Sequence, residues 1–71
     1  MSGAVVLDKG WCLYTHPDGS LEVRKRGHGG WHTIKKARDP NELQKFVTTH
    51  HPDLAPRLRH AIATIREDFQ N

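Results

Sequence analysis

Two turn signals between Gly10 and Lys36 constrain the fold of this chain more than any other feature. Pro17-Asp18-Gly19 and the glycine-rich stretch from Gly27 to Gly30 separate three short segments that contain β-forming residues. Proline sets φ at the first central position of a turn, and glycine accepts the left-handed conformation that a tight hairpin needs. The pattern predicts an antiparallel meander with strands at about residues 11–15, 21–26 and 31–36. A fourth strand is expected if the apolar run Ala4–Leu7 pairs ahead of them.

The Pro17-Asp18-Gly19 turn determines how the first two of these strands pair. A three-residue loop pairs His16 with Ser20, and Leu13 then lies opposite Val23. A slip by one residue would scatter the apolar side chains over both faces of the sheet, so this register is favoured. One face is then formed by Trp11, Leu13, Thr15, Leu21 and Val23, and the other by Cys12, Tyr14, His16, Glu22, Arg24 and Arg26.

The orientation of the third segment stays open at this point. Alternate residues of a regular strand share a side, so Trp31 and Ile34 point to opposite faces. Either Ile34 faces the core and Trp31 stands outward beside Tyr14, or Trp31 is buried and Ile34 is exposed. Tryptophan has the larger apolar surface to bury, which slightly favours a buried Trp31.

Two helices are expected after the strands. Asp39-Pro40-Asn41-Glu42 supplies an N-cap, a proline at the first helical position and an acid in the first turn, which predicts a helix over about residues 40–49. Asp53 is expected to cap a second helix over about residues 54–69. The apolar residues that would face the core are Leu43, Phe46 and Val47 in the first helix and Leu54, Leu58, Ala61, Ile62, Ile65 and Phe69 in the second. Strands followed by helices predict an α+β domain whose two C-terminal helices pack on one face of the sheet.

The size of the chain limits what it can do. Its 71 residues suit a single small domain, residues 1–71, and leave little room for a deep catalytic cavity beside the core. The single cysteine, Cys12, excludes an internal disulfide, and the apolar runs are too short for a signal peptide or a membrane span. We therefore expect a cytoplasmic protein with no membrane partner and no small-molecule substrate.

The candidate catalytic and metal-binding residues form no productive pattern. The chain has six histidines but no Cys-x-x-Cys, and the nearest pair, His28 and His32, is not on a helix face. Cys12 lies about 13 Å along the strand from His16, beyond hydrogen-bond reach. Arg24, the residue opposite, can lower the thiol pKa but cannot act as a base. We expect no enzymatic activity, no metal and no cofactor.

The distribution of charge carries the main functional signal. Six cations lie between Arg24 and Arg38 with no acidic residue among them, in a chain whose net charge is +3. Cations and aromatic rings on a sheet face suit phosphate neutralisation together with base stacking. We therefore expect a non-enzymatic nucleic-acid-binding module that uses the outer face of the sheet. Its candidate binding residues are Tyr14, Arg24, Arg26, Trp31, Lys35, Lys36 and Arg38.

The region from Gly10 to Val47 resembles a known DNA-binding family. A tryptophan, a Pro-Asp-Gly hairpin, a basic strand and a third strand leading into a helix are similar to the three-stranded DNA-binding domains of phage integrase arms. In that family the sheet enters the major groove. The resemblance implies that Arg24, Arg26 and the third strand lie at the bases, and it does not include the second helix.

The same residues also suit a protein-interaction module, such as a regulator, an inhibitor or a small subunit of a larger complex. Trp, Tyr and Arg dominate the binding energy of protein interfaces, and an acidic protein would complement the charge. Charged strands also discourage edge-to-edge aggregation, so the cations have a purely structural explanation as well. Salt separates the two binding modes, because nucleic-acid binding weakens steeply as salt is added.

Overall fold

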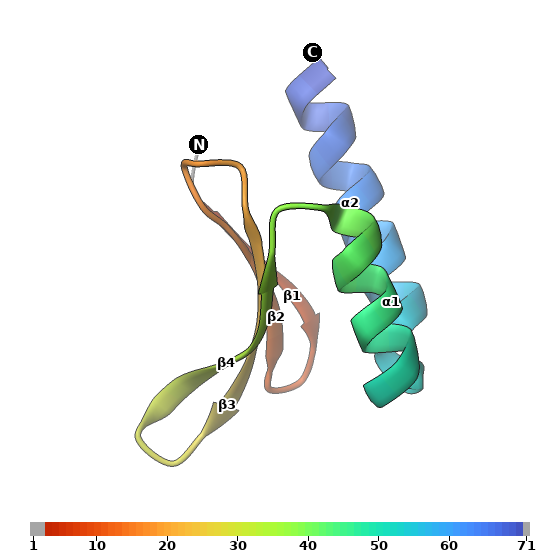
Figure 1. Cartoon of the computed structure of the whole chain (residues 1–71). Helices are drawn as coiled ribbons and strands as arrows, with labels where there is room; N and C mark the ends of the chain where they lie inside the picture. The colour runs from red at the N-terminus through yellow and green to blue at the C-terminus, as the bar shows by residue number, and fades with distance from the viewer. Residues whose placement is uncertain (1–2, 71) are drawn as a thin grey trace.

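The computed structural model describes the backbone of residues 3–70 and the side chains of residues 3–65. Four strands form one antiparallel sheet in the order β1-β2-β3-β4, namely β1 (Gly3–Asp8), β2 (Trp11–Thr15), β3 (Leu21–Gly27) and β4 (Gly30–Ala37). Helix α1 (Pro40–His50), a 3₁₀ turn η1 (Pro52–Leu54) and helix α2 (Ala55–Gln70) follow. This confirms the predicted α+β arrangement, and the apolar run near the N-terminus forms the fourth strand (Figure 1).

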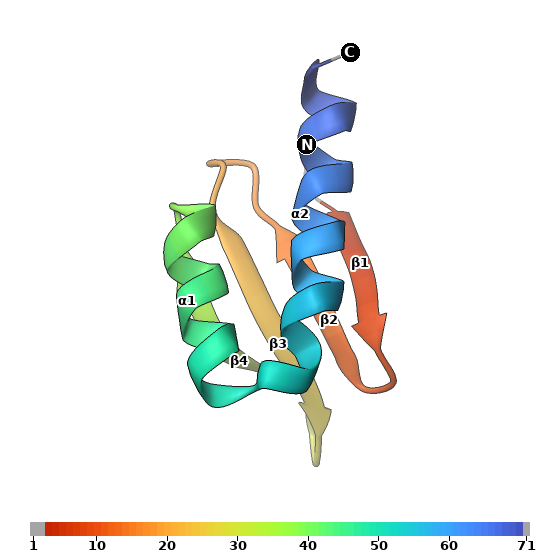
Figure 2. The same ribbon diagram turned by 90° about the vertical axis from the view of Figure 1, so that its right-hand side faces the viewer.

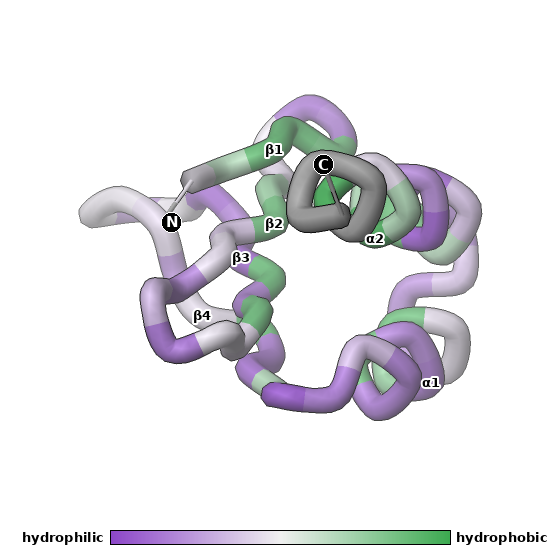
Figure 3. The backbone as a smooth tube through the Cα atoms, turned by 90° about the horizontal axis from the view of Figure 1, so that it is seen from above, coloured by the Kyte–Doolittle hydropathy of each residue, from purple (hydrophilic) through white to green (hydrophobic). Residues whose placement is uncertain are grey.

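Both helices lie on the same side of the sheet, and the opposite side is uncovered (Figure 1, Figure 3). We call the covered side the inner face and the other side the outer face. Helix α1 packs beside β4, and α2 packs beside β1 (Figure 2). The β3–β4 hairpin extends beyond the helices (Figure 1). In the described part of the chain, neither helix has the length and apolar character needed to cross a membrane.

The β2–β3 hairpin has the predicted register. Leu13 pairs with Val23, and the His16 backbone N–H donates to the Ser20 carbonyl at 2.9 Å. Gly19 has φ +91°, the left-handed conformation that this loop requires. The Asp18 carboxylate also accepts hydrogen bonds from the backbone N–H and the hydroxyl of Ser20, and these side-chain bonds stabilise the turn in addition to the backbone bond.

A β-bulge in β4 settles the orientation that the sequence left open. Lys35 pairs with Val23, but Thr33 pairs with Arg24, so Ile34 is an extra residue between them. Ile34 packs against the core, and Trp31 lies on the outer face with 49% of its surface exposed. The expectation of a buried Trp31 was therefore wrong. The bulge interrupts the alternation, and Trp31 lies on the part of the hairpin that extends beyond the helices.

The core fills the space between the inner face and the two helices. Its completely buried side chains are Leu13, Val23, Leu43, Val47 and Leu58. The predicted helical stripe is present as far as the side chains are described, because Leu54, Ala61 and Ile62 are also buried and Ile65 is partly buried. The side chain of Phe69, the last member of that stripe, lies outside the described residues.

The two helix starts differ. Asp39 caps α1 as predicted, since its carboxylate accepts from the Asn41 N–H at 2.9 Å. Asp53 does not precede α2 directly, because it lies inside η1, where the Leu54 N–H donates to the His51 carbonyl at 2.9 Å. Pro52 starts this tight turn, and α2 begins only at Ala55.

We expect Leu58→Ala to lower the free energy of unfolding by about 2–5 kcal/mol, because it leaves a cavity in a fully packed site. Urea unfolding followed by circular dichroism measures this change. The neighbouring exposed position provides the control, and Arg59→Ala is expected to change the value by less than about 0.5 kcal/mol. A similarly small effect of both substitutions would contradict the placement of Leu58 in the core.

Candidate nucleic-acid interface

The outer face contains most of the predicted binding residues. The strand register places Tyr14 on β2, Arg24 and Arg26 on β3, and Trp31 and Lys36 on β4 together on this face. The remaining members of the face are Ala4, Val6, Cys12, Glu22 and Thr33. No helix of the described chain lies over the outer face of the sheet (Figure 1).

A buried carboxylate lies at the centre of this face. Glu22 is only 4% exposed although it points away from the core. Arg24 binds it with two nitrogens, Nε at 2.9 Å from Oε2 and Nη2 at 3.0 Å from Oε1. Nε2 of His16 lies 2.6 Å from Oε1, and the Thr33 hydroxyl donates to Oε2. We call His16, Glu22, Arg24 and Thr33 the Glu22 cluster.

The Glu22 cluster keeps its carboxylate ionised. Hydrogen bonds from Arg24 first, and from Thr33 and His16, lower the pKa of Glu22 to about 2 against the opposing effect of burial. A bidentate pair of this kind neutralises the guanidinium locally. Arg24 is therefore held by Glu22, and binding a phosphate would compete with that pair. The sequence signal for this role was the i, i+2 spacing of Glu22 and Arg24 on one strand face.

The ring of Tyr14 is covered by the same cluster. The Arg24 guanidinium carbon lies 4.2 Å from the centre of the Tyr14 ring, a cation–π distance. The His16 ring approaches Tyr14 edge-on at 4.8 Å between centroids. The face of Tyr14 on which Arg24 lies is therefore occupied in this structure and does not receive a base unless Arg24 moves.

The open cations lie on β3, on β4 and directly after β4. Arg26 lies opposite Trp31, and Lys36 lies opposite Glu22. Neither Arg26 nor Lys36 forms an ion pair with the described residues, and both are exposed. Arg38 follows β4, and its side chain is 82% exposed, with a 4.0 Å contact between Nη2 and the Asp18 carboxylate. We call Arg26, Trp31, Lys36 and Arg38 the basic row.

Lys35 lies on the other side of the sheet. The bulge turns it to the inner face, where its ammonium group is 3.8 Å from Glu42 and 5.5 Å from the centre of the Phe46 ring. Lys35 was predicted, together with Lys36, to bind a partner on the outer face, although adjacent residues of a strand point to opposite faces. The structure separates it from the basic row.

The cysteine and the histidines of the described chain form no catalytic or metal-binding group. Burial raises the pKa of the Cys12 thiol more than Arg24 lowers it, so the thiol stays protonated and is a poor nucleophile. Nε2 of His32 lies 2.9 Å from the carbonyl oxygen of His28, within the β3–β4 hairpin. Within residues 3–65, no three His, Cys, Asp or Glu side chains gather in a way that would hold a metal ion.

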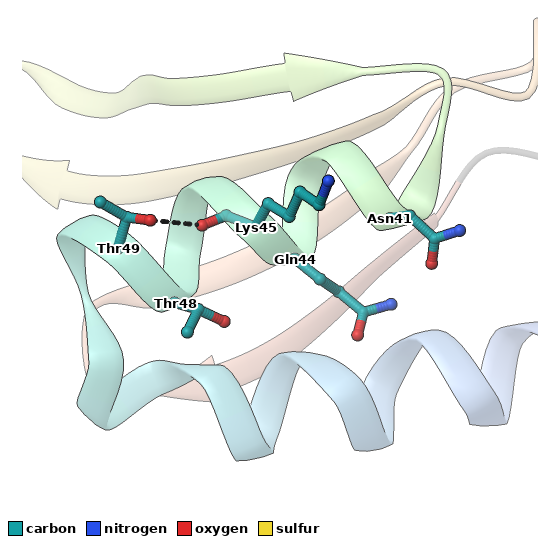
Figure 4. Close-up of a pocket in the computed structure, with 5 residues that line it drawn as sticks. All are labelled: Asn41, Gln44, Lys45, Thr48 and Thr49. Carbon is teal, nitrogen blue, oxygen red and sulfur yellow. Dashed lines mark hydrogen bonds between the residues drawn. The ribbon is translucent and has the colours of Figure 1, made fainter.

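A shallow polar hollow lies on the outward side of α1 (Figure 4). It is lined by Asn41, Gln44, Lys45, Thr48 and Thr49. The Thr49 hydroxyl donates to the Lys45 carbonyl at 3.0 Å, which uses part of its hydrogen-bonding capacity within the helix. With one cation and no acid, this surface provides a matched comparison for the basic row.

In comparisons with known proteins, no family model matches this chain, and neither a curated protein nor a solved structure matches it significantly. The resemblance to the integrase-arm domains thus rests on the turns and charges of residues 10–47. The structure has three strands and a helix in that order, with β1 and α2 in addition.

We expect the Glu22 cluster to make stability depend on acid pH. The pKa of Glu22 is about 2 in the folded protein and near 4.5 in the unfolded chain. As the pH falls, the Glu22 carboxylate is protonated in the unfolded chain before it is protonated in the folded protein. The cluster therefore adds about 1–3 kcal/mol to the free energy of unfolding above pH 5, and this contribution is lost towards pH 2.

Thermal melting of the wild type and of Glu22→Gln between pH 7 and pH 2 measures this loss. The two curves should converge as the pH falls, because the variant has no proton to take up at this site. Glu42→Gln is the control, since that carboxylate is 61% exposed. A constant difference between wild type and Glu22→Gln over the whole range would contradict the assignment.

Proposed function

We propose that this protein is a nucleic-acid-binding module and that the basic row on the outer face is its contact surface. The supporting observation is the projecting β3–β4 hairpin, in which residues 25–33 are all exposed and Arg26 lies directly opposite Trp31. Two-stranded β-ribbons have dimensions that fit the major groove of duplex DNA. The stretch from Arg24 to Arg38 contains no acid to repel a phosphate.

The residues of the basic row have different roles in this proposal. Arg26, Lys36 and Arg38 contact phosphates, and Trp31 stacks on a base or sugar. Arg24 belongs to the Glu22 cluster and Tyr14 packs against it, so both shape the surface on which these contacts are made. Lys35 lies on the inner face, so in this proposal it contributes to binding only through long-range electrostatic attraction of the phosphates. Such a cytoplasmic binding module needs neither a cofactor nor a catalytic group.

A second candidate function is a protein-interaction module, a regulator or small subunit that docks through the same face. Val6 is 79% exposed and Trp31 is 49% exposed, and both lie on the outer face. Exposed apolar side chains are typical anchors of protein interfaces. This function predicts an acidic protein partner and a weaker dependence of affinity on salt than nucleic acid shows.

We expect Arg26→Ala combined with Lys36→Ala to weaken binding of every nucleic-acid sequence by a similar factor. The slope of log K against log salt should become shallower by about 1.8 for duplex DNA, or about 0.9 per lost phosphate contact. Fluorescence anisotropy with a short duplex and a single-stranded oligonucleotide measures this over about 50 to 200 mM salt. Lys45→Ala, the loss of one exposed cation on α1, should leave the slope unchanged.

Wild-type protein that binds neither oligonucleotide more tightly than about 0.1 mM at physiological salt would overturn the nucleic-acid proposal. The protein-interaction function would then be the leading candidate. An equal change of slope for Lys45→Ala would instead show that binding is non-specific with respect to the surface used.

We expect Trp31→Ala to weaken single-strand binding by about 1–3 kcal/mol if a base stacks on the exposed indole. Tyr14→Leu should have a smaller effect, because Arg24 already covers one face of that ring. The same anisotropy titration compares the two variants after thermal melting has shown that both are folded. A larger loss for Tyr14→Leu would mean that Arg24 moves aside and that the Glu22 cluster takes part in binding.

A further inference from the structure

The two edges of the sheet differ in their protection. The β4 edge carries Lys35 and Lys36 and a bulge at Ile34, features that discourage pairing with another strand. The β1 edge has no charge and no proline from Gly3 to Leu7. An edge strand presents unpaired N–H and C=O groups, so β1 can still accept a neighbour, although its Leu7 carbonyl already accepts a hydrogen bond from Nη1 of Arg57.

A groove runs beside the β1 edge. Val5 and Leu7 line it from the strand, and Pro56 and Ala61 line it from α2. The groove extends round the strand to Val6, whose side chain is 79% exposed on the outer face. The outer side of β1 is therefore accessible along its free edge, whereas Leu7 on the inner side is buried in the core.

We propose that β1 pairs antiparallel with β1 of a second copy of this chain, so that the two sheets form one continuous sheet of eight strands. Residues directly opposite each other share a face, which restricts the alignment. Pairing Val5 with Val5 of the second copy satisfies this condition. It also places Ala4 opposite Val6 and Gly3 opposite Leu7, so all the paired positions are uncharged and the two valines are β-branched.

A second copy fits this edge because the uncharged residues of β1 pair with themselves in this alignment, and the Arg57 cation beside the strand opposes the pairing only weakly. Nη1 of Arg57 lies 3.3 Å from the Leu7 carbonyl oxygen, so this cation is at one end of the groove. In the proposed alignment the Leu7 residues of the two copies are four positions apart along the strands, about 13 Å. That distance exceeds the Debye length of about 8 Å at physiological salt, so the two Arg57 side chains repel each other weakly.

The basic row is at the opposite edge of the sheet from β1. Two positively charged copies therefore meet through an uncharged strand and keep their cationic surfaces apart. The paired segment is short, and interfaces of small area are weak. We expect a dissociation constant between about 10 μM and 1 mM.

Sedimentation equilibrium of the full chain in nucleic-acid-free buffer, from micromolar to millimolar concentration, tests the proposal. A reversible monomer–dimer equilibrium is expected. Val6→Lys should weaken it at least about tenfold, because the alignment brings two ammonium groups onto neighbouring strands of one face. Trp31→Lys is the matched control, since it makes the same change to an exposed apolar residue on the other edge strand, and it should leave the association unchanged.

Amide hydrogen exchange of the unmodified protein gives a second readout that does not depend on the folding of a variant. Protection of amides in Ala4–Leu7 should rise with protein concentration, and protection in β4 should stay constant. A monomer up to about 1 mM would overturn the proposal. So would an association that Trp31→Lys abolishes and Val6→Lys does not, which would place the contact on the basic row. An association that leaves exchange in Ala4–Leu7 unchanged would also overturn it.

Discussion

Burial of the inner face of the sheet beneath the two helices is the interaction on which the other features depend. Leu13 and Val23 lie opposite each other on neighbouring strands and are completely buried under α1 and α2. Because successive side chains of a strand alternate, burying these two residues sends Tyr14, Glu22 and Arg24 to the uncovered side. The polar outer face is thus a consequence of where the few apolar residues lie.

The sequence predicted those parts of the fold that follow from local rules. The three-residue turn at Pro17-Asp18-Gly19 and the cap at Asp39 were recognisable, because each depends on residue types a few positions apart. The bulge at Ile34 was not recognisable from the sequence. It arises because Ile34 and the adjacent Lys35 both lie on the inner face, which a regular strand does not allow. The turn at Pro52 likewise displaced the start of the second helix from its expected cap.

In the candidate site, too, the sequence predicted which residue types are present but not which of them pair in the folded protein. Counting the cations from Arg24 to Arg38 overstates the charge available to a partner, because Glu22 holds Arg24 and the bulge turns Lys35 towards Glu42. Both pairings depend on which strands and helices become neighbours, and composition does not contain that information. The remaining cations lie along the β3–β4 hairpin and just after it, an arrangement that would suit a linear chain of phosphates.

The exposure of the hairpin on both faces has a mechanical consequence. Residues 25–33 receive no cover from the helices, so this end of the sheet is held mainly by its own ladder of backbone hydrogen bonds. Segments with so few buried contacts open and deform at low free-energy cost. The hairpin can therefore change its twist to follow the curvature of a partner while Leu13 and Val23 stay packed. The hairpin part of the proposed binding surface is thus also the part of the sheet that adapts with the least strain on the core.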